Sequence, residues 1–117
     1  MSGRLTTHVL DTAHGCPAAG LTVELWRLAG DTRHLIMRGQ TNADGRLDQP
    51  LLTDDTPVVG VYELVFAVGA YFAERGVAAT DPPFLDQVPV RFGLSAAGHY
   101  HVPLLVSPWA YSTYRGS

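Results

Sequence analysis

The sequence predicts an all-β protein, a sandwich of two sheets with about eight strands and one short helix. Short apolar runs recur along the 117 residues, and clusters of turn residues separate them at the spacing typical of sandwich strands. Apolar and polar residues alternate within several runs, as expected of strands with one buried face. Only residues 70–77 have a helical composition, and they make two turns at most.

Turn and break signals place the expected elements in order. The first run is broken at residues 14–17 by a glycine and a proline, and residues 29–31 turn the second strand into the third. Residues 42–45 (Asn-Ala-Asp-Gly) predict a tight turn, because Asn, Asp and Gly tolerate left-handed backbone conformations. Gly76 is suited to end the helix. The expected strands cover residues 4–11, 21–28, 33–40, 58–68, 87–92, 99–106 and 109–114.

Prolines and strand edges in the sequence indicate whether the protein forms an oligomer. The strands at 87–92 and 99–106 each contain a proline, which predicts a sheet edge or irregular pairing. A sandwich leaves edge strands that must be blunted or paired, and the C-terminal region is rich in Val, Leu, Tyr and Trp. We therefore expect an oligomer. No linker or charge block divides the chain, so we expect one domain over residues 1–117.

Composition excludes several classes of function. All eight basic residues are arginine, and without lysine neither a Schiff base nor a phosphate-binding P-loop can form. A net charge of -3 disfavours binding to nucleic acid. No apolar run reaches membrane-spanning length, and the N-terminus lacks the apolar core of a signal peptide. We expect a cytoplasmic protein with neither nucleic acid nor membrane as a partner.

Strand parity points three histidines away from the core. His99 and His101 are two residues apart and share one strand face, and His8 lies on the outward face of the first strand together with Thr6. The alternate positions of the later strand form an apolar set that suits the core: Tyr100, Val102, Leu104 and Val106. A solvated strand face is the common explanation for any one histidine. Three outward histidines also suit a site.

The residue types in this set favour proton transfer. Histidine has an ordinary pKa of about 6.5 and can both accept and donate a proton near neutral pH. Three histidines and a water could instead bind zinc, but no further ligand accompanies the pair, so metal-free chemistry ranks first. Arg46 follows the turn at residues 42–45. It is either a plain surface arginine or a planar fork for an oxyanion or a flat heterocycle.

Several other conspicuous residues are assigned no chemical role. Two histidines lie in a turn and in a polar stretch, and the one cysteine has no local partner that would lower its pKa. The two tryptophans suit packing or an interface. These residues are His14, His34, Cys16, Trp26 and Trp109. The last seven residues, 111–117, are aromatic and hydroxylated, which fits either a trailing strand or a terminus tied down inside a site.

Three segments resemble the 5-hydroxyisourate hydrolases, the transthyretin-related proteins of purine breakdown. They are LTTHVLD near the start, TNADGR in the middle and HYHVPLLVSPWAYSTYRGS at the end, of which the terminal YRGS is the most specific. The related hormone carriers lack that ending. The resemblance implies a transthyretin-like, two-sheet, eight-stranded sandwich with one short helix. It also implies a homotetramer, a dimer of dimers, with active sites in the channel between the dimers.

The resemblance carries functional roles over to particular residues. It implies hydrolysis of 5-hydroxyisourate, a cyclic amide, to 2-oxo-4-hydroxy-4-carboxy-5-ureidoimidazoline, with no cofactor or metal. His8 or His101 would be the general base, Arg46 would hold the ring or the developing oxyanion, and His99 would support them. Tyr114, Arg115 and Gly116 would line the pocket, and Ser117 would orient a histidine or the water.

A carrier function is the alternative. The same sandwich in the hormone carriers holds a flat ligand in the channel without chemistry. A carrier should line its channel with apolar and small residues, whereas the resemblance places histidines and an arginine there. Where the carriers have a lysine at the channel mouth this chain has His8, which can take and give a proton near pH 7.

Overall fold

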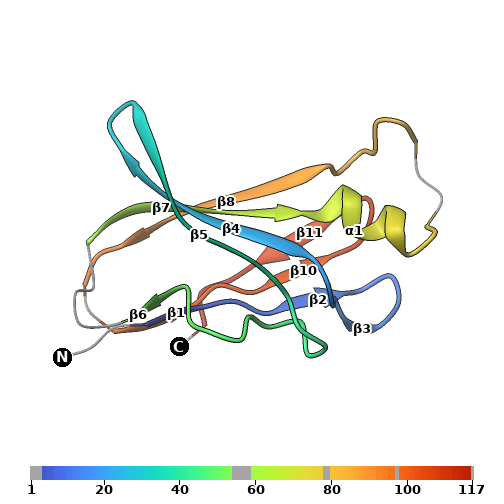
Figure 1. Ribbon diagram of the computed structural model, residues 1–117, viewed down its shortest axis with the longest axis horizontal. Helices are drawn as coiled ribbons and strands as arrows, with labels where there is room; N and C mark the ends of the chain where they lie inside the picture. The colour runs from blue at the N-terminus through green and yellow to red at the C-terminus, as the bar shows by residue number, and fades with distance from the viewer. Residues whose placement is uncertain (1–3, 54–58, 78–79, 97, 117) are drawn as a thin grey trace.

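The computed structural model describes residues 4–53, 59–77, 80–96 and 98–116. Its strands form two layers, with the helix at one end (Figure 1). The elements are β1 (Arg4–Thr6), β2 (Val9–Asp11), β3 (Cys16–Pro17), β4 (Thr22–Ala29), β5 (Thr32–Gln40), β6 (Leu52–Thr53), β7 (Gly60–Ala67), α1 (Val68–Glu74), β8 (Gln87–Leu94), β9 (His99–His101), β10 (Leu104–Val106) and β11 (Tyr111–Thr113). No helix in these ranges is long and apolar enough to cross a membrane.

The two layers differ in how their strands pair. One is antiparallel throughout, in the order β5-β4-β7-β8. The other combines β6-β1-β9 with β11-β10-β2-β3, and here β1 runs parallel to β9 and β2 parallel to β10. Between these pairs, the Val102 N–H donates to the Thr6 carbonyl and the Leu104 N–H to the His8 carbonyl, each at 2.9 Å. The second layer is therefore continuous across the breaks in its strands.

The core lies between the layers and confirms the predicted strand parity. Leu5 and Val9 are fully buried, and Thr7 between them is also buried, with its hydroxyl donating to the Val102 carbonyl at 2.6 Å. Thr6 and His8, on the opposite parity, are half-buried. The largest fully buried side chains come from both layers and from the segments beside them: Tyr62, Phe66, Leu5, Leu21, Leu25, Leu64, Leu104, Val9, Val23, Val68, Val88 and Val106.

The strands differ from the prediction in their breaks. Residues 4–11 divide into β1 and β2, and residues 99–106 divide into β9 and β10 around Pro103, which has no N–H to donate. Pro89 lies in β8, an edge strand as the proline indicated. The strands β3 and β6 were not predicted, because two residues are too few to show a period. The first residue of the strand expected at 58–68 lies outside the described residues.

The predicted helix is confirmed, but it begins two residues and ends three residues earlier than expected. Its end is closed by a Schellman motif. Gly76 has a φ of 71°, its N–H donates to the Ala73 carbonyl, and the Val77 N–H donates to the Phe72 carbonyl, both at 3.1 Å. The expectation that Gly76 ends this helix is therefore confirmed, since a left-handed residue at this position favours glycine.

A buried carboxylate joins the end of β2 to α1. Asp11 accepts hydrogen bonds from the His14 backbone N–H at 2.9 Å and from the Tyr71 hydroxyl at 2.8 Å, and the His14 Nδ1 lies 2.6 Å from it. Burial by itself raises the pKa of Asp11, but these hydrogen bonds outweigh it and hold the pKa below the ordinary 3.8. Burial and the bond to Asp11 also raise the pKa of Tyr71 to about 12. His14 is exposed, as expected of a surface residue, and its ring also contacts this carboxylate, which was not predicted.

Asp11→Asn should destabilise the protein in a pH-dependent way. A carboxyl whose folded pKa is depressed stabilises the fold above its unfolded pKa and loses that effect as the pH falls through the folded value. We expect a loss of about 1–3 kcal/mol in the free energy of unfolding at pH 7. The difference from the unchanged protein should shrink below about pH 4.

Urea denaturation at pH 7, 5 and 3.5 measures this effect. Asp31→Asn, at the exposed turn between β4 and β5, is the matched control, with an expected change within about 0.5 kcal/mol. A loss in Asp11→Asn that stays constant from pH 7 to pH 3.5 would contradict the role given to the carboxylate.

Candidate active site

His8 and Arg46 lie opposite each other in an isolated antiparallel bridge. His8 comes from the link between β1 and β2, and Arg46 from the end of the turn at residues 42–45. The Val9 N–H donates to the Gly45 carbonyl at 2.8 Å, which holds the turn against the strand. The His8 Nε2 lies 2.8 Å from the Asp44 carbonyl oxygen. Because a carbonyl only accepts, Nε2 carries a proton, and Nδ1 is the free nitrogen of the neutral ring.

The turn that presents Arg46 is held by Asn42. Its side-chain oxygen accepts the Asp44 N–H at 2.9 Å and the Arg46 N–H at 3.1 Å. Gly45 has a φ of 76°, and a Cβ there would collide with the Val9 carbonyl oxygen. The predicted turn is thus confirmed, and glycine is required in it by backbone conformation and by space.

His99 and His101 both contact the hydroxyl of Thr6. Thr6 pairs with His101 across β1 and β9. Its Oγ1 lies 2.8 Å from the His101 Nδ1 and 3.3 Å from the His99 Nε2. Thr6 was not among the candidate residues. The available signal was its parity, because it shares the outward face with His8.

Strand pairing brings these groups to one face, because His8 lies opposite Arg46, and Thr6, two residues before His8, pairs with His101. The half-buried ring of His101 has a pKa below the ordinary 6.5, first because burial disfavours the charged form, and then because a positive charge on the ring would be repelled by Arg46 and by any positive charge on His8 or His99. The imidazole of His101 is therefore neutral at pH 7 and available as a base. Four of the predicted site residues meet in this cluster, on the face of the second layer that points away from the core.

The C-terminal tail contacts the cluster through Gly116. Gly116 forms an isolated bridge with His101, in which the Gly116 N–H donates to the His101 carbonyl at 2.6 Å and the His101 N–H donates back at 3.3 Å. A Cβ on Gly116 would lie 3.1 Å from both Cβ and Cδ2 of His101. The absence of a side chain therefore lets the tail approach the histidine closely.

The remaining tail residues lie elsewhere. The Arg115 guanidinium stands 4.4 Å from the centre of the Tyr100 ring, and Tyr100 has the opposite parity to the two histidines of β9. Arg115 and the exposed Tyr114 line a cavity of about 220 Å³ with Tyr100 and Val102. Within the described residues Arg115 is therefore not brought to the histidines. Ser117 lies outside the described residues.

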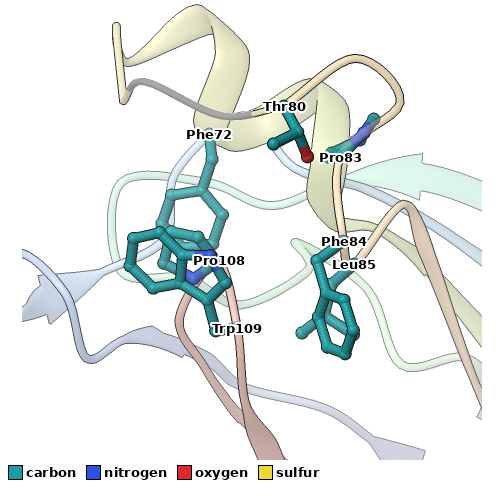
Figure 2. A pocket seen from close by; sticks show the side chains of 8 residues that line it. Phe72, Thr80, Pro83, Phe84, Leu85, Pro108 and Trp109 are labelled. Carbon is teal, nitrogen blue, oxygen red and sulfur yellow. The ribbon is translucent and has the colours of Figure 1, made fainter.

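The molecule has a further hollow outside this cluster. This small hollow beside α1 is lined by Phe72, Phe84, Trp109 and their neighbours, without a titratable side chain among them (Figure 2). In the described part of the chain, no group of three His, Cys, Asp or Glu side chains is placed to hold a metal ion. The chemistry of this fold is therefore concentrated in the cluster around His101.

The fold and this outward polar cluster define a transthyretin-like sandwich protein. A family model described as the HIUase/Transthyretin family matches residues 5–116. A curated relative, 5-hydroxyisourate hydrolase 2 of Rhizobium meliloti, is 61% identical over 117 residues, which cover 99% of this chain and 98% of the relative. The chain belongs to the HIUase/Transthyretin family, which confirms the resemblance seen in the sequence.

Solved structures confirm the sandwich. The crystal structure of (S)-allantoin synthase matches with a TM-score of 0.93 and 49% identity over 99% of this chain, which spans only 44% of that longer protein. Sea bream transthyretin in complex with thyroxine matches with a TM-score of 0.85 and 29% identity, over 97% of this chain and 94% of that one. The same fold thus occurs in an enzyme and in a protein crystallised with a bound hormone.

Gly45→Ala tests how the turn holds Arg46 and His8. A left-handed backbone costs a non-glycine residue about 1–3 kcal/mol, and at Gly45 a collision with the Val9 carbonyl adds to this. Gly20→Ala is the matched control, because its φ of 77° is the same and no atom lies within 4 Å of the added Cβ. Urea denaturation should show a clearly larger loss of stability for Gly45→Ala. Equal losses would contradict the close approach.

Proposed function

We propose that this chain hydrolyses 5-hydroxyisourate, opening its six-membered ring at a cyclic amide to give 2-oxo-4-hydroxy-4-carboxy-5-ureidoimidazoline. The observation that carries the proposal is the placement of His8, Arg46 and His101 on one face of the sandwich by strand pairing and the bridge between His8 and Arg46. Burial also lowers the pKa of His101, which favours its neutral form. The names of close relatives support the same substrate, since they are 5-hydroxyisourate hydrolases of nearly the same length. The reaction belongs to purine breakdown.

The reaction needs a base for water and a partner for a developing negative oxygen. The neutral His101 takes a proton from water as the water oxygen bonds to the amide carbon, a step that contributes roughly 10²–10⁴-fold. The Arg46 guanidinium stabilises the oxyanion of the tetrahedral intermediate. The C–N bond then breaks, and the nitrogen takes a proton from a histidine. His8, whose Nε2 proton is held by the Asp44 carbonyl, binds the substrate with Nδ1 or takes part in this transfer.

The supporting parts follow the roles implied by the resemblance. His99 supports His101, and Gly116 lines the substrate pocket next to His101. Within one chain Tyr114 and Arg115 line the separate cavity with Tyr100, so the roles that the resemblance implies for them are not part of this proposal. Ser117 orients a histidine or the water. The mechanism uses no cofactor and no metal. We further propose that residues 1–117 form one cytoplasmic domain.

We propose that the protein works as a homotetramer, a dimer of dimers, with its sites in the channel between the dimers. The exposed aromatic side chains near the C-terminus support this assembly. Trp109 is 65% exposed and Tyr114 is 60% exposed. Covering these rings with another copy would remove apolar surface from water.

Activity on the substrate is the direct test. Freshly generated 5-hydroxyisourate should lose its ultraviolet absorbance faster with the protein than in buffer alone. His8→Ala, Arg46→Ala and His101→Ala should each lower kcat/KM by about 10²-fold or more, because each removes an acid–base or oxyanion partner. His34→Ala, on the exposed strand β5, should keep full activity.

Two outcomes would contradict this assignment. A rate equal to that of buffer would overturn the hydrolase function. Inactivation by EDTA with recovery on added zinc would replace the metal-free mechanism with a metal-dependent one. Gel filtration of each variant beside the unchanged protein controls for loss of assembly.

The carrier function is the less favoured alternative, because the outward face presents imidazole and guanidinium groups rather than an apolar lining. Deleting residues 114–117 separates the two functions. Hydrolysis should disappear, because the deletion removes the bridge between Gly116 and His101. A binding channel would instead be opened by the same deletion and would keep its ligand. Unchanged hydrolysis after the deletion would contradict the role of the tail.

A further inference from the structure

The hydroxyl of Thr6 is the contact shared by the two histidines of β9. Its oxygen lies 2.8 Å from the Nδ1 of His101 and 3.3 Å from the Nε2 of His99. A hydroxyl has one hydrogen to donate, and its oxygen accepts through lone pairs. When both rings are neutral, Thr6 can donate to one ring nitrogen and accept an N–H from the other. The side chain thus links the tautomer of one histidine to that of its neighbour.

Two arrangements place the Thr6 hydrogen between the two rings. In the first, Thr6 donates to His101, whose other nitrogen, Nε2, then carries the ring's hydrogen. In the second, the His101 Nδ1–H donates to Thr6, and Thr6 donates to His99. Only the second leaves a lone pair on the Nε2 of His101. Since Nδ1 is occupied by Thr6, Nε2 is the nitrogen left to accept a proton from water.

We propose that Thr6 is a positioning residue that holds His101 in the Nδ1–H tautomer, with His99 as the acceptor that orients the hydroxyl. The direction of these hydrogen bonds, from His101 through Thr6 to His99, rests on the proposed function, which needs a base at His101. Such a partner is what allows a neutral imidazole to present its second nitrogen as a base. Thr6 and His99 act through His101 and need not touch the substrate.

The surroundings of His101 leave Thr6 as the partner of Nδ1. The charged and titratable groups that act on this ring are Arg46, His8 and His99, and all are cationic or neutral rather than acidic. The tail contributes Gly116, which has no side chain, and Arg115, whose guanidinium lies over Tyr100. Across β1, Arg4 pairs with His99. Within the described residues, the charged groups that act on His101 do not include a carboxylate. A hydroxyl therefore takes the position that a carboxylate occupies in other histidine sites.

Thr6→Val is the decisive variant, because valine keeps the shape and the strand preference of threonine and removes only the hydroxyl. Thr6→Ser restores the hydroxyl. Thr12→Val is the matched control: Thr12 follows the end of β2, and its hydroxyl donates to the Val106 carbonyl at 3.1 Å, away from both histidines of β9. Circular dichroism and gel filtration establish that each variant folds and assembles.

The first readout is the tautomer itself, measured without substrate. Nitrogen-15 NMR of the intact protein at pH 8, above the ordinary imidazole pKa of about 6.5, distinguishes protonated Nδ1 from protonated Nε2. We expect Nδ1–H at His101 in the unchanged protein, in Thr6→Ser and in Thr12→Val, and a shift to Nε2–H in Thr6→Val. Nε2–H in the unchanged protein, or no change in Thr6→Val, would overturn the proposal.

The second readout is turnover of 5-hydroxyisourate. Thr6→Val should lower kcat/KM at least about tenfold, a part of what positioned acid–base catalysis contributes, and Thr6→Ser should recover most of it. His99→Ala should lose activity too, and Thr6→Val combined with His99→Ala should lose no more than the worse single variant, because both act on one chain of contacts. Full activity in Thr6→Val, or additive losses in the double variant, would overturn the proposal.

The two readouts keep the two proposals apart. A protein that does not accelerate the reaction, but whose His101 tautomer follows Thr6, would contradict the proposed hydrolase function and support the positioning role. An active protein whose His101 tautomer does not depend on Thr6 would support the hydrolase function and contradict the positioning role.

Discussion

The parallel pairing of the N-terminal segment with the strand pair β9 and β10 is the constraint on which the site depends. Hydrogen bonds from the Val102 N–H to the Thr6 carbonyl and from the Leu104 N–H to the His8 carbonyl keep these two segments in register across the breaks in both strands. Since side chains alternate along each strand, this register puts Thr6 beside His101 and His8 on the same outward face. A shift by one residue would turn these side chains into the core.

Elements at the margins of this layer complete the site. The turn at residues 42–45 brings Arg46 to His8, and the tail brings Gly116 to His101, each through an isolated bridge. Both contacts depend on a glycine that lets one backbone approach another, Gly45 against Val9 and Gly116 against His101. Backbone contacts therefore set the positions of the side chains in this cluster.

The opposite end of the same layer is held by polar contacts of another kind. Asp11 is buried and receives hydrogen bonds from His14 and Tyr71, so that β2, the following turn and α1 are joined at one carboxylate. His14 and His101 show that histidine has different roles at the two ends of this layer. The ring of His14 contacts a buried carboxylate, whereas the pKa of His101 is lowered by burial and by the nearby Arg46.

The sequence by itself determined the class of fold, the turn before Arg46, the glycine that ends the helix and the outward face of His8, His99 and His101. These follow from local rules, since strand period and left-handed turn residues act within a few positions. It did not determine the breaks within the strands, the partners of Asp11 or the contact of Thr6 with both histidines. Those depend on which strands pair and in what register, and hydrogen bonds between residues about 95 positions apart, such as Thr6 and His101, exist only once the layers have assembled.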